Sequence, residues 1–166
     1  MSPVLEVPGA PLVIDHGVGP VHIERSGPLG ALLAWVAGLP AGERCDVTFR
    51  VEAGGADLRW CRRYQAARCE RSADTTVRAT ATGFVERRGP VALQFALTGP
   101  GQAALSSVRF LGVPLPRHML SSRIESVRTD NGLRTTVTIA IGRGALGRLR
   151  YTADLVEVPE MAEVPR

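Results

Sequence analysis

Residues 110–126, FLGVPLPRHMLSSRIES, combine side chains that could bind a ligand or transfer a proton. His118 follows a loop stiffened by Pro114 and Pro116, and imidazole titrates near neutral pH, as a general acid or base requires. Arg117 beside it can hold a carboxylate or a phosphate. Two interpretations stay open. The prolines either end one strand and aim the next, or they hold these polar groups at the mouth of an apolar pocket.

Arg123 and Glu125 follow on the expected strand 122–128. They are two residues apart, so they share one face, while Ile124 points the other way. If Ile124 faces the core, the pair lies outside in solvent. If the opposite face lines a cavity, Arg123 and Glu125 can orient a ligand's carbonyl or hydroxyl group.

Trp60, Arg62 and Tyr64 share a face by the same period of two. The row is either an external ladder held by cation–π contact or the wall of a pocket with a polar handle. Tyr151 is either a core residue with its hydroxyl satisfied or a proton donor across the same cavity. The candidate catalytic residues are therefore His118, Glu125 and Tyr64, and the candidate ligand-binding residues are Trp60, Arg62, Arg117, Arg123 and Tyr151.

The familiar catalytic patterns are absent from the sequence. It contains no G-x-S-x-G elbow, no P-loop, no H-E-x-x-H and no Gly-rich dinucleotide fingerprint. The three cysteines form no C-x-x-C pair and the three histidines are scattered, which argues against a metal site. We expect reduced, mostly buried thiols, no metal and no cofactor.

The composition indicates one globular domain. The chain has 166 residues, 45% of them hydrophobic, and a net charge of +4. All 20 basic residues are arginine, but they are spread along the chain, and the aromatic residues are too few for a base-stacking platform. We therefore expect no nucleic-acid partner. No apolar run reaches about 18 residues, and the N-terminus does not resemble a signal peptide. We expect a cytoplasmic protein that does not span a membrane and that can form a homodimer.

Residues 27–38 are predicted to form the main helix. Ser26 can cap it, Pro28 suits its first turn, and Leu29, Leu32 and Val36 follow helical spacing. Because its other face is also hardly polar, the helix should be buried or cover something apolar. Residues 1–14 read as a loose lead-in with at most one edge strand.

From Arg44 onward the hydrophobic period changes to two, which indicates strands. We expect strands near 44–52, 57–64, 69–72, 75–86, 91–97, 103–111, 122–128, 133–141 and 149–155. Asn131-Gly132 is the strongest hairpin signal. The spacing predicts eight or nine antiparallel strands in one domain, 15–157, with a frayed tail at 158–166. Such a long meander must close into a barrel or curl strongly around the helix to protect its edges.

Four short motifs resemble a bacterial family known as domain of unknown function 4166. They are Trp60-Cys-Arg-Arg-Tyr64, Gly89-Pro90, Leu111-Gly-Val-Pro-Leu-Pro-Arg117 and Gly147-Arg-Leu-Arg-Tyr151, and the resemblance spans about residues 17–157. It implies a largely β, cytoplasmic domain, stand-alone or fused. It carries no assigned chemistry, so no catalytic residue is inherited. Thr152-Ala153-Asp154 departs from the bulkier Arg-Gly-Trp of the family.

The sequence favours a barrel that encloses a hydrophobic small molecule, with Arg117 and His118 at its mouth. If the protein is an enzyme, we expect cofactor-free cyclisation or isomerisation of a polyketide- or lipid-like metabolite, as in natural product biosynthesis, because such reactions need a shaped cavity and few polar groups. The alternative is a non-catalytic accessory domain that binds a protein partner through an apolar patch or a sheet edge.

Overall fold

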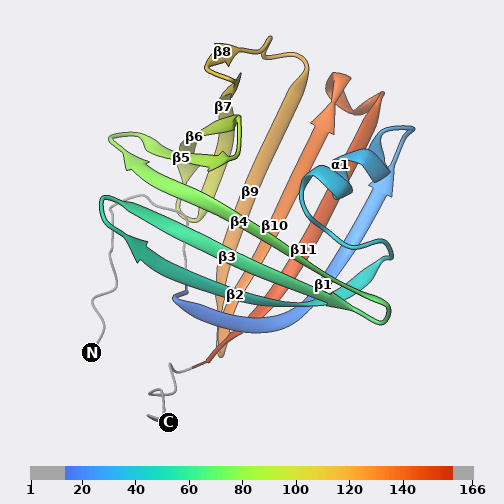
Figure 1. Ribbon diagram of the computed structural model, residues 1–166, viewed down its shortest axis with the longest axis vertical. Helices are drawn as coiled ribbons and strands as arrows, with labels where there is room; N and C mark the ends of the chain where they lie inside the picture. The colour runs from blue at the N-terminus through green and yellow to red at the C-terminus, as the bar shows by residue number, and fades with distance from the viewer. Residues whose placement is uncertain (1–13, 159–166) are drawn as a thin grey trace.

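The computed structural model describes residues 14–158, which form one antiparallel sheet and a short helix (Figure 1). The strands are β1 (His16–Ser26), β2 (Arg44–Gly54), β3 (Asp57–Ala66), β4 (Cys69–Thr80), β5 (Gly83–Arg88), β6 (Val91–Gly99), β7 (Gln102–Phe110), β8 (Val113–Pro114), β9 (Leu120–Thr129), β10 (Gly132–Ile141) and β11 (Gly147–Glu157). The predicted loose segment 1–14 and frayed tail 158–166 lie outside the described residues, apart from Ile14 and Val158.

The sheet closes on itself. Each strand from β1 to β7 pairs with the next, β7 pairs with β9, and β9 to β11 lead back to β1. Ten strands therefore form a barrel, and the two-residue strand β8 adds to the outer side of β7. Closure satisfies the backbone hydrogen-bonding groups that an open sheet would leave at its edges. The expected barrel is confirmed, but the expected count of eight or nine strands is too low.

Alternating side chains fill the barrel with two apolar clusters. The first cluster lies toward the helix and includes Ile23, Val47, Tyr64 and Leu149. The second cluster is aromatic, and its buried members are Trp60, Val77, Phe84, Phe95, Ala103, Ile124 and Val137. Phe49, Ile139 and Tyr151 pack against both clusters. Two apolar clusters thus fill the interior, and the second is rich in aromatic residues.

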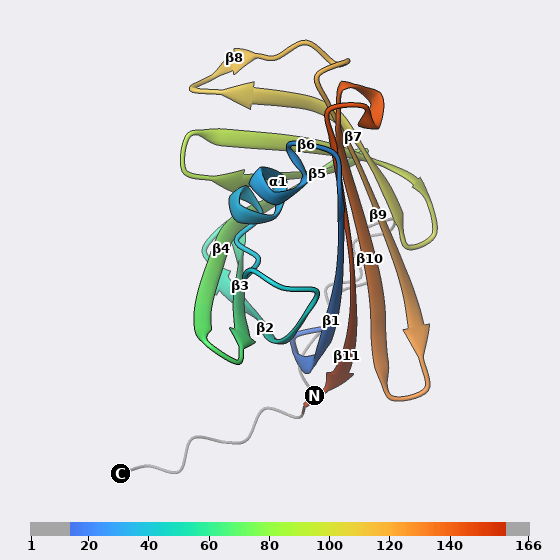
Figure 2. The same cartoon turned by 90° about the vertical axis from the view of Figure 1, so that its right-hand side faces the viewer.

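Helix α1 (Gly30–Val36) packs on the barrel near the end where β1 stops (Figure 2). Leu33 and Ala34 are buried in the first cluster, while Leu32 and Trp35 are exposed. The prediction that this helix covers something apolar is therefore confirmed. Its bounds are shorter than the predicted 27–38, because Ser26 still belongs to β1 and caps nothing. Within the described residues, no helix is long and apolar enough to cross a membrane.

Two strand predictions were wrong in detail. The sequence predicts no strand at the position of β1, since the possible edge strand is expected within residues 1–14, but β1 pairs with both β2 and β11 in the barrel wall. The segment 69–86 was expected to turn near Ala73, but β4 runs unbroken through that residue and the chain turns at residues 81–82. Ala73 faces the interior and is fully buried in the first cluster. It is therefore a core residue of a continuous strand.

Gly19 is where β1 and β11 approach most closely. A Cβ atom at this position would lie 1.8 Å from the carbonyl oxygen of Asp154, which is a backbone atom. Because a backbone atom moves only by distorting the strand, no side chain fits here.

We predict that Gly19→Ala lowers the free energy of unfolding by about 2 kcal/mol or more, as for other strained core substitutions. Gly99→Ala is the matched control, since the atom nearest to a Cβ added there is a flexible amide oxygen 3.8 Å away. Urea unfolding followed by circular dichroism measures both variants. Equal stability of the two would contradict the close approach.

Candidate functional site

The row Trp60, Arg62 and Tyr64 on β3 faces the barrel interior. Trp60 and Tyr64 are 8% and 3% exposed, and their strand partners Val51 and Val47 are also inward-facing apolar residues. The sequence leaves two interpretations open for the row. In the structure the row faces the barrel interior and is not an external ladder. A guanidinium group is thereby placed within an apolar core.

Arg62 is neutralised by Glu86 of β5. Its Nη2 donates to Glu86 Oε1 at 2.8 Å and lies 3.4 Å from Thr75 Oγ1. The Arg62 and Glu86 side chains are only 16% and 12% exposed. Burial alone would lower the pKa of Arg62, but the Glu86 carboxylate outweighs it and raises the pKa. The Arg62 guanidinium therefore stays charged inside the barrel.

The ion pair lies between the two apolar clusters. On β3, Arg62 separates Trp60 of the second cluster from Tyr64 of the first. On β4, Thr75 likewise separates Val77 from Ala73. A thin polar layer thus crosses an otherwise apolar interior.

An aromatic chain borders this layer on one side. Trp60 meets Phe49 edge-on with ring centroids 6.1 Å apart, lies 5.9 Å from Phe84, and Phe84 stacks on Phe95 at 4.9 Å. The Arg62 guanidinium carbon lies 5.4 Å from the Trp60 ring centroid, within cation–π range. The arrangement offers flat apolar surfaces next to one fixed cation.

Trp60 also carries a hydrogen-bond donor that the protein does not use. Its buried indole Nε1 has no acceptor among the described residues. A buried N–H without a partner costs about 1–3 kcal/mol, and native proteins rarely keep one without a reason. A ligand's acceptor atom can satisfy it only if neighbouring side chains move, because Nε1 has no accessible surface.

The wall around the aromatic chain is not fully covered by its own side chains. Inward-facing residues that pack against the second cluster nevertheless stay partly exposed, namely Phe49, Val51, Leu58, Leu93, Leu97 and Leu105. A side chain that faces inward keeps accessible surface only where the space in front of it is not filled. These residues therefore present accessible apolar surface at the aromatic end.

The two tyrosines remain protonated donors at neutral pH. Burial raises the pKa of Tyr64 and, more strongly, the pKa of Tyr151. Both hydroxyl groups interact electrostatically with Arg62. The structure thus brings together four of the predicted site residues: Trp60, Arg62, Tyr64 and Tyr151.

The other four predicted residues lie elsewhere. Arg117 and His118 are exposed on the loop between β8 and β9. Ile124 is buried, as are Ser122 and Ser126 on the same face of β9, so Arg123 and Glu125 project outward and pair with each other at 3.0 Å, with 58% and 46% of their side chains exposed. The alternative in which Arg123 and Glu125 line a cavity is therefore wrong. The carboxylate that faces the interior is that of Glu86.

Sequence reasoning missed Glu86 and Thr75. The only available signal for Glu86 was its alternation with Phe84 on a short strand, which puts the two on one face. The expectation of mostly buried thiols was also wrong, since only Cys45 is buried and Cys69 is exposed. Burial raises the pKa of the Cys45 thiol to about 11.

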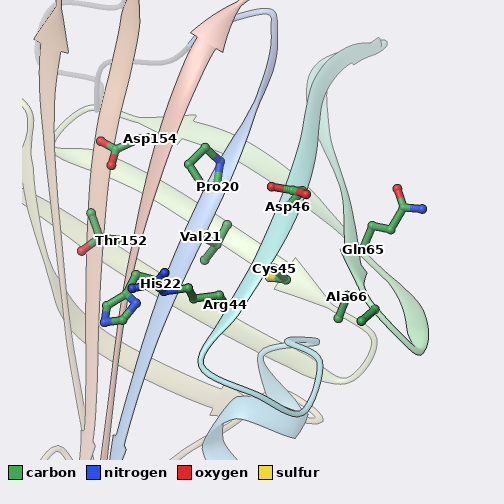
Figure 3. Close-up of a pocket in the computed structure, with 11 residues that line it drawn as sticks. Pro20, Val21, His22, Arg44, Cys45, Asp46, Gln65, Ala66, Thr152 and Asp154 are labelled. Carbon is green, nitrogen blue, oxygen red and sulfur yellow. The ribbon is translucent and has the colours of Figure 1, made fainter.

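A separate hollow lies on the outer wall, where β1, β2 and β11 run side by side (Figure 3). Its rim includes His22 and Arg44, which are register partners on β1 and β2, together with Asp46 and Thr152. It contains none of the predicted site residues. Among residues 14–158, no group of three or more His, Cys, Asp or Glu side chains is arranged to hold a metal ion.

We predict that Glu86→Gln lowers the free energy of unfolding by about 3–5 kcal/mol, because it leaves the Arg62 charge buried without a partner. The matched control is Asp154→Asn, which breaks the exposed ion pair with Arg134 and should cost below about 1 kcal/mol. Chemical denaturation measures both variants. A similar small loss in the two would show that the Arg62 site is solvated.

Tyr64 and Tyr151 are the only tyrosines of the chain, so tyrosinate absorbance reports on them alone. Their raised pKa values stabilise the fold fully below about pH 10, the unfolded value, and this contribution is lost as the pH rises further. We predict that no tyrosinate forms near pH 10 in the native protein and that it then forms together with unfolding. A gradual titration centred near pH 10 with intact circular dichroism would contradict their burial.

Comparison with known proteins places this architecture in a family. Residues 10–154 match the family described as Domain of unknown function (DUF4166). Searches among curated proteins and among solved structures each gave no match. The matched region takes in the described strands almost completely, including the four motifs that carry the resemblance. The ten-stranded barrel with its inward-facing Arg62–Glu86 pair thus belongs to a member of the DUF4166 family.

Proposed function

We propose that the barrel binds a hydrophobic small molecule at its aromatic end, next to Arg62. The observation that carries this proposal is the apolar inner wall that stays partly exposed around the aromatic chain, close to the unpartnered Nε1 of buried Trp60. A ligand would cover that apolar surface. The ligand is an apolar, planar molecule with one carbonyl or acidic acceptor group.

The same groups suit proton transfer without a cofactor. Protonated Tyr64 and Tyr151 can donate to a ligand carbonyl, and the Arg62 guanidinium stabilises negative charge that develops on its oxygen. The Glu86 carboxylate is the interior base on which a proton can be held. We propose on this basis that catalysis, if the protein performs it, is isomerisation or cyclisation of a polyketide- or lipid-like metabolite.

The test uses 8-anilinonaphthalene-1-sulfonate, a fluorescent probe that has fused apolar rings and an anionic acceptor. A Trp35→Phe background leaves Trp60 as the only tryptophan, so energy transfer from Trp60 reports binding near the site. We predict saturable binding of one probe per chain. Val51→Phe, which enlarges the partly exposed strand partner of Trp60, should weaken it at least about tenfold, the loss of roughly 1.4 kcal/mol.

Val127→Phe is the matched control, because Val127 is 62% exposed on the outer side of β9. It should leave the probe affinity unchanged. The double variant Arg62→Met/Glu86→Met removes both charges together, which avoids a buried unpaired charge, and should weaken binding of the anionic probe. Affinity that is the same in Val51→Phe and Val127→Phe would overturn the interior site.

A further inference from the structure

Exposed apolar side chains gather at one end of the barrel. Of twelve large hydrophobic residues that are exposed, nine belong to α1 or to the segments 110–119 and 142–146. We call these nine the apolar rim; they are Leu32, Trp35, Val36, Phe110, Leu111, Val113, Leu115, Met119 and Leu146. Single exposed apolar residues are ordinary on a protein surface, but a concentration of this kind marks an interaction surface.

Hydrogen bonds connect the segments of the rim into a ring. Arg88 Nη1 donates to the Val36 carbonyl at 2.6 Å, which joins α1 to the turn between β5 and β6. The amide of Leu111 donates to the Pro90 carbonyl at 2.9 Å. The ring is therefore tied from α1 across to the β7–β8 loop.

The second half of the ring is closed in the same way. The amide of Gly142 donates to the Met119 carbonyl at 3.2 Å, and the amide of Leu29 donates to the Leu146 carbonyl at 2.9 Å. The β8–β9 loop, the β10–β11 loop and α1 are thereby joined, at the end that lies uppermost in Figures 1 and 2. The segments of the rim are thus held together by three backbone hydrogen bonds and one from the Arg88 side chain.

The charge of this end has one sign. Exposed arginines 88, 109, 117 and 143 lie on or beside the rim segments. No Asp or Glu occurs in residues 26–42, 87–124 or 131–153. Among the described residues, none of the four arginines forms an ion pair with a carboxylate. Beside α1, a hollow lined by Trp35 and Leu39 also has Arg25 and Arg71 in its wall.

We infer that this end binds the surface of an anionic lipid membrane. Apolar side chains enter the boundary between headgroups and acyl chains, while arginines meet the negative lipid phosphates. A second copy of the chain suits the surface less, because a two-fold interface would set arginine against arginine. A nucleic acid would pair with the arginines but would leave the nine apolar side chains in water.

The test measures binding to phosphatidylcholine vesicles with and without one third phosphatidylglycerol. In a Trp60→Phe background, Trp35 is the only tryptophan, and it is 62% exposed. We predict that anionic vesicles shift its emission to shorter wavelength and carry the protein down in sedimentation. Neutral vesicles and high salt should reduce binding at least about tenfold, since the attraction is largely electrostatic.

Matched variants separate the rim from the rest of the surface. Leu111→Asp should weaken binding at least about tenfold, whereas Val127→Asp, similarly exposed but away from the rim, should weaken it much less. Arg117→Gln and Arg143→Gln should each weaken binding roughly fivefold, whereas Arg128→Gln changes the net charge equally on the outer wall and should have a smaller effect.

Three results would overturn the inference. They are no vesicle binding, an equal loss of vesicle binding in the rim and control variants, or a homodimer in light scattering that Leu111→Asp dissociates. Because the readout is vesicle binding, it is independent of whether the interior binds 8-anilinonaphthalene-1-sulfonate. Circular dichroism of each variant separates loss of binding from loss of folding.

Discussion

Closure of the sheet through the β6–β7 and β7–β9 pairs is the constraint on which the rest of the structure depends. Once ten strands form a ring, each strand has one side inside and one side outside, and period-two alternation assigns every residue to one of them. Arg62 shares its side with Trp60 and Tyr64, so the same alternation that buries the aromatic residues also buries the charge. Glu86 is then required inside, since a buried guanidinium without a counter-charge is strongly unfavourable.

The sequence predicted strands well where alternation was uninterrupted. Strand β2 shows this, because Cys45 and Val47 alternate with charged residues and are buried as expected. Strand β1 was missed because Gly17, Gly19 and Pro20 hide its alternation. Gly19 is needed for its close approach to the Asp154 carbonyl, and this contact joins residues too distant in sequence for any local pattern to indicate it.

Only part of the candidate site is predictable from the sequence, because local spacing does not show which distant residues meet. Alternation put Trp60, Arg62 and Tyr64 on one face, but only the closed sheet decides whether that face is inside. Glu86 lies 24 residues from Arg62 in sequence, and no local pattern pairs them. For Arg123 and Glu125 the decisive residue was Ile124: its burial turns both charged side chains outward. Local spacing thus shows which residues share one face of a strand. Only the closed sheet shows whether that face points into the barrel and which residue from another strand it meets.

The outer wall and the end of the barrel differ in how their arginines are paired with acidic residues. On the wall, arginines are matched by acids on neighbouring strands, as in Arg59–Asp74, Arg78–Asp57 and Arg134–Asp154. Exposed pairs of this kind add little stability, but they cancel the local field. At the apolar rim no acid is available in the sequence segments that build it. At this end, among the described residues, arginines without an acidic partner lie beside exposed apolar side chains, an arrangement that suits a partner both anionic and apolar.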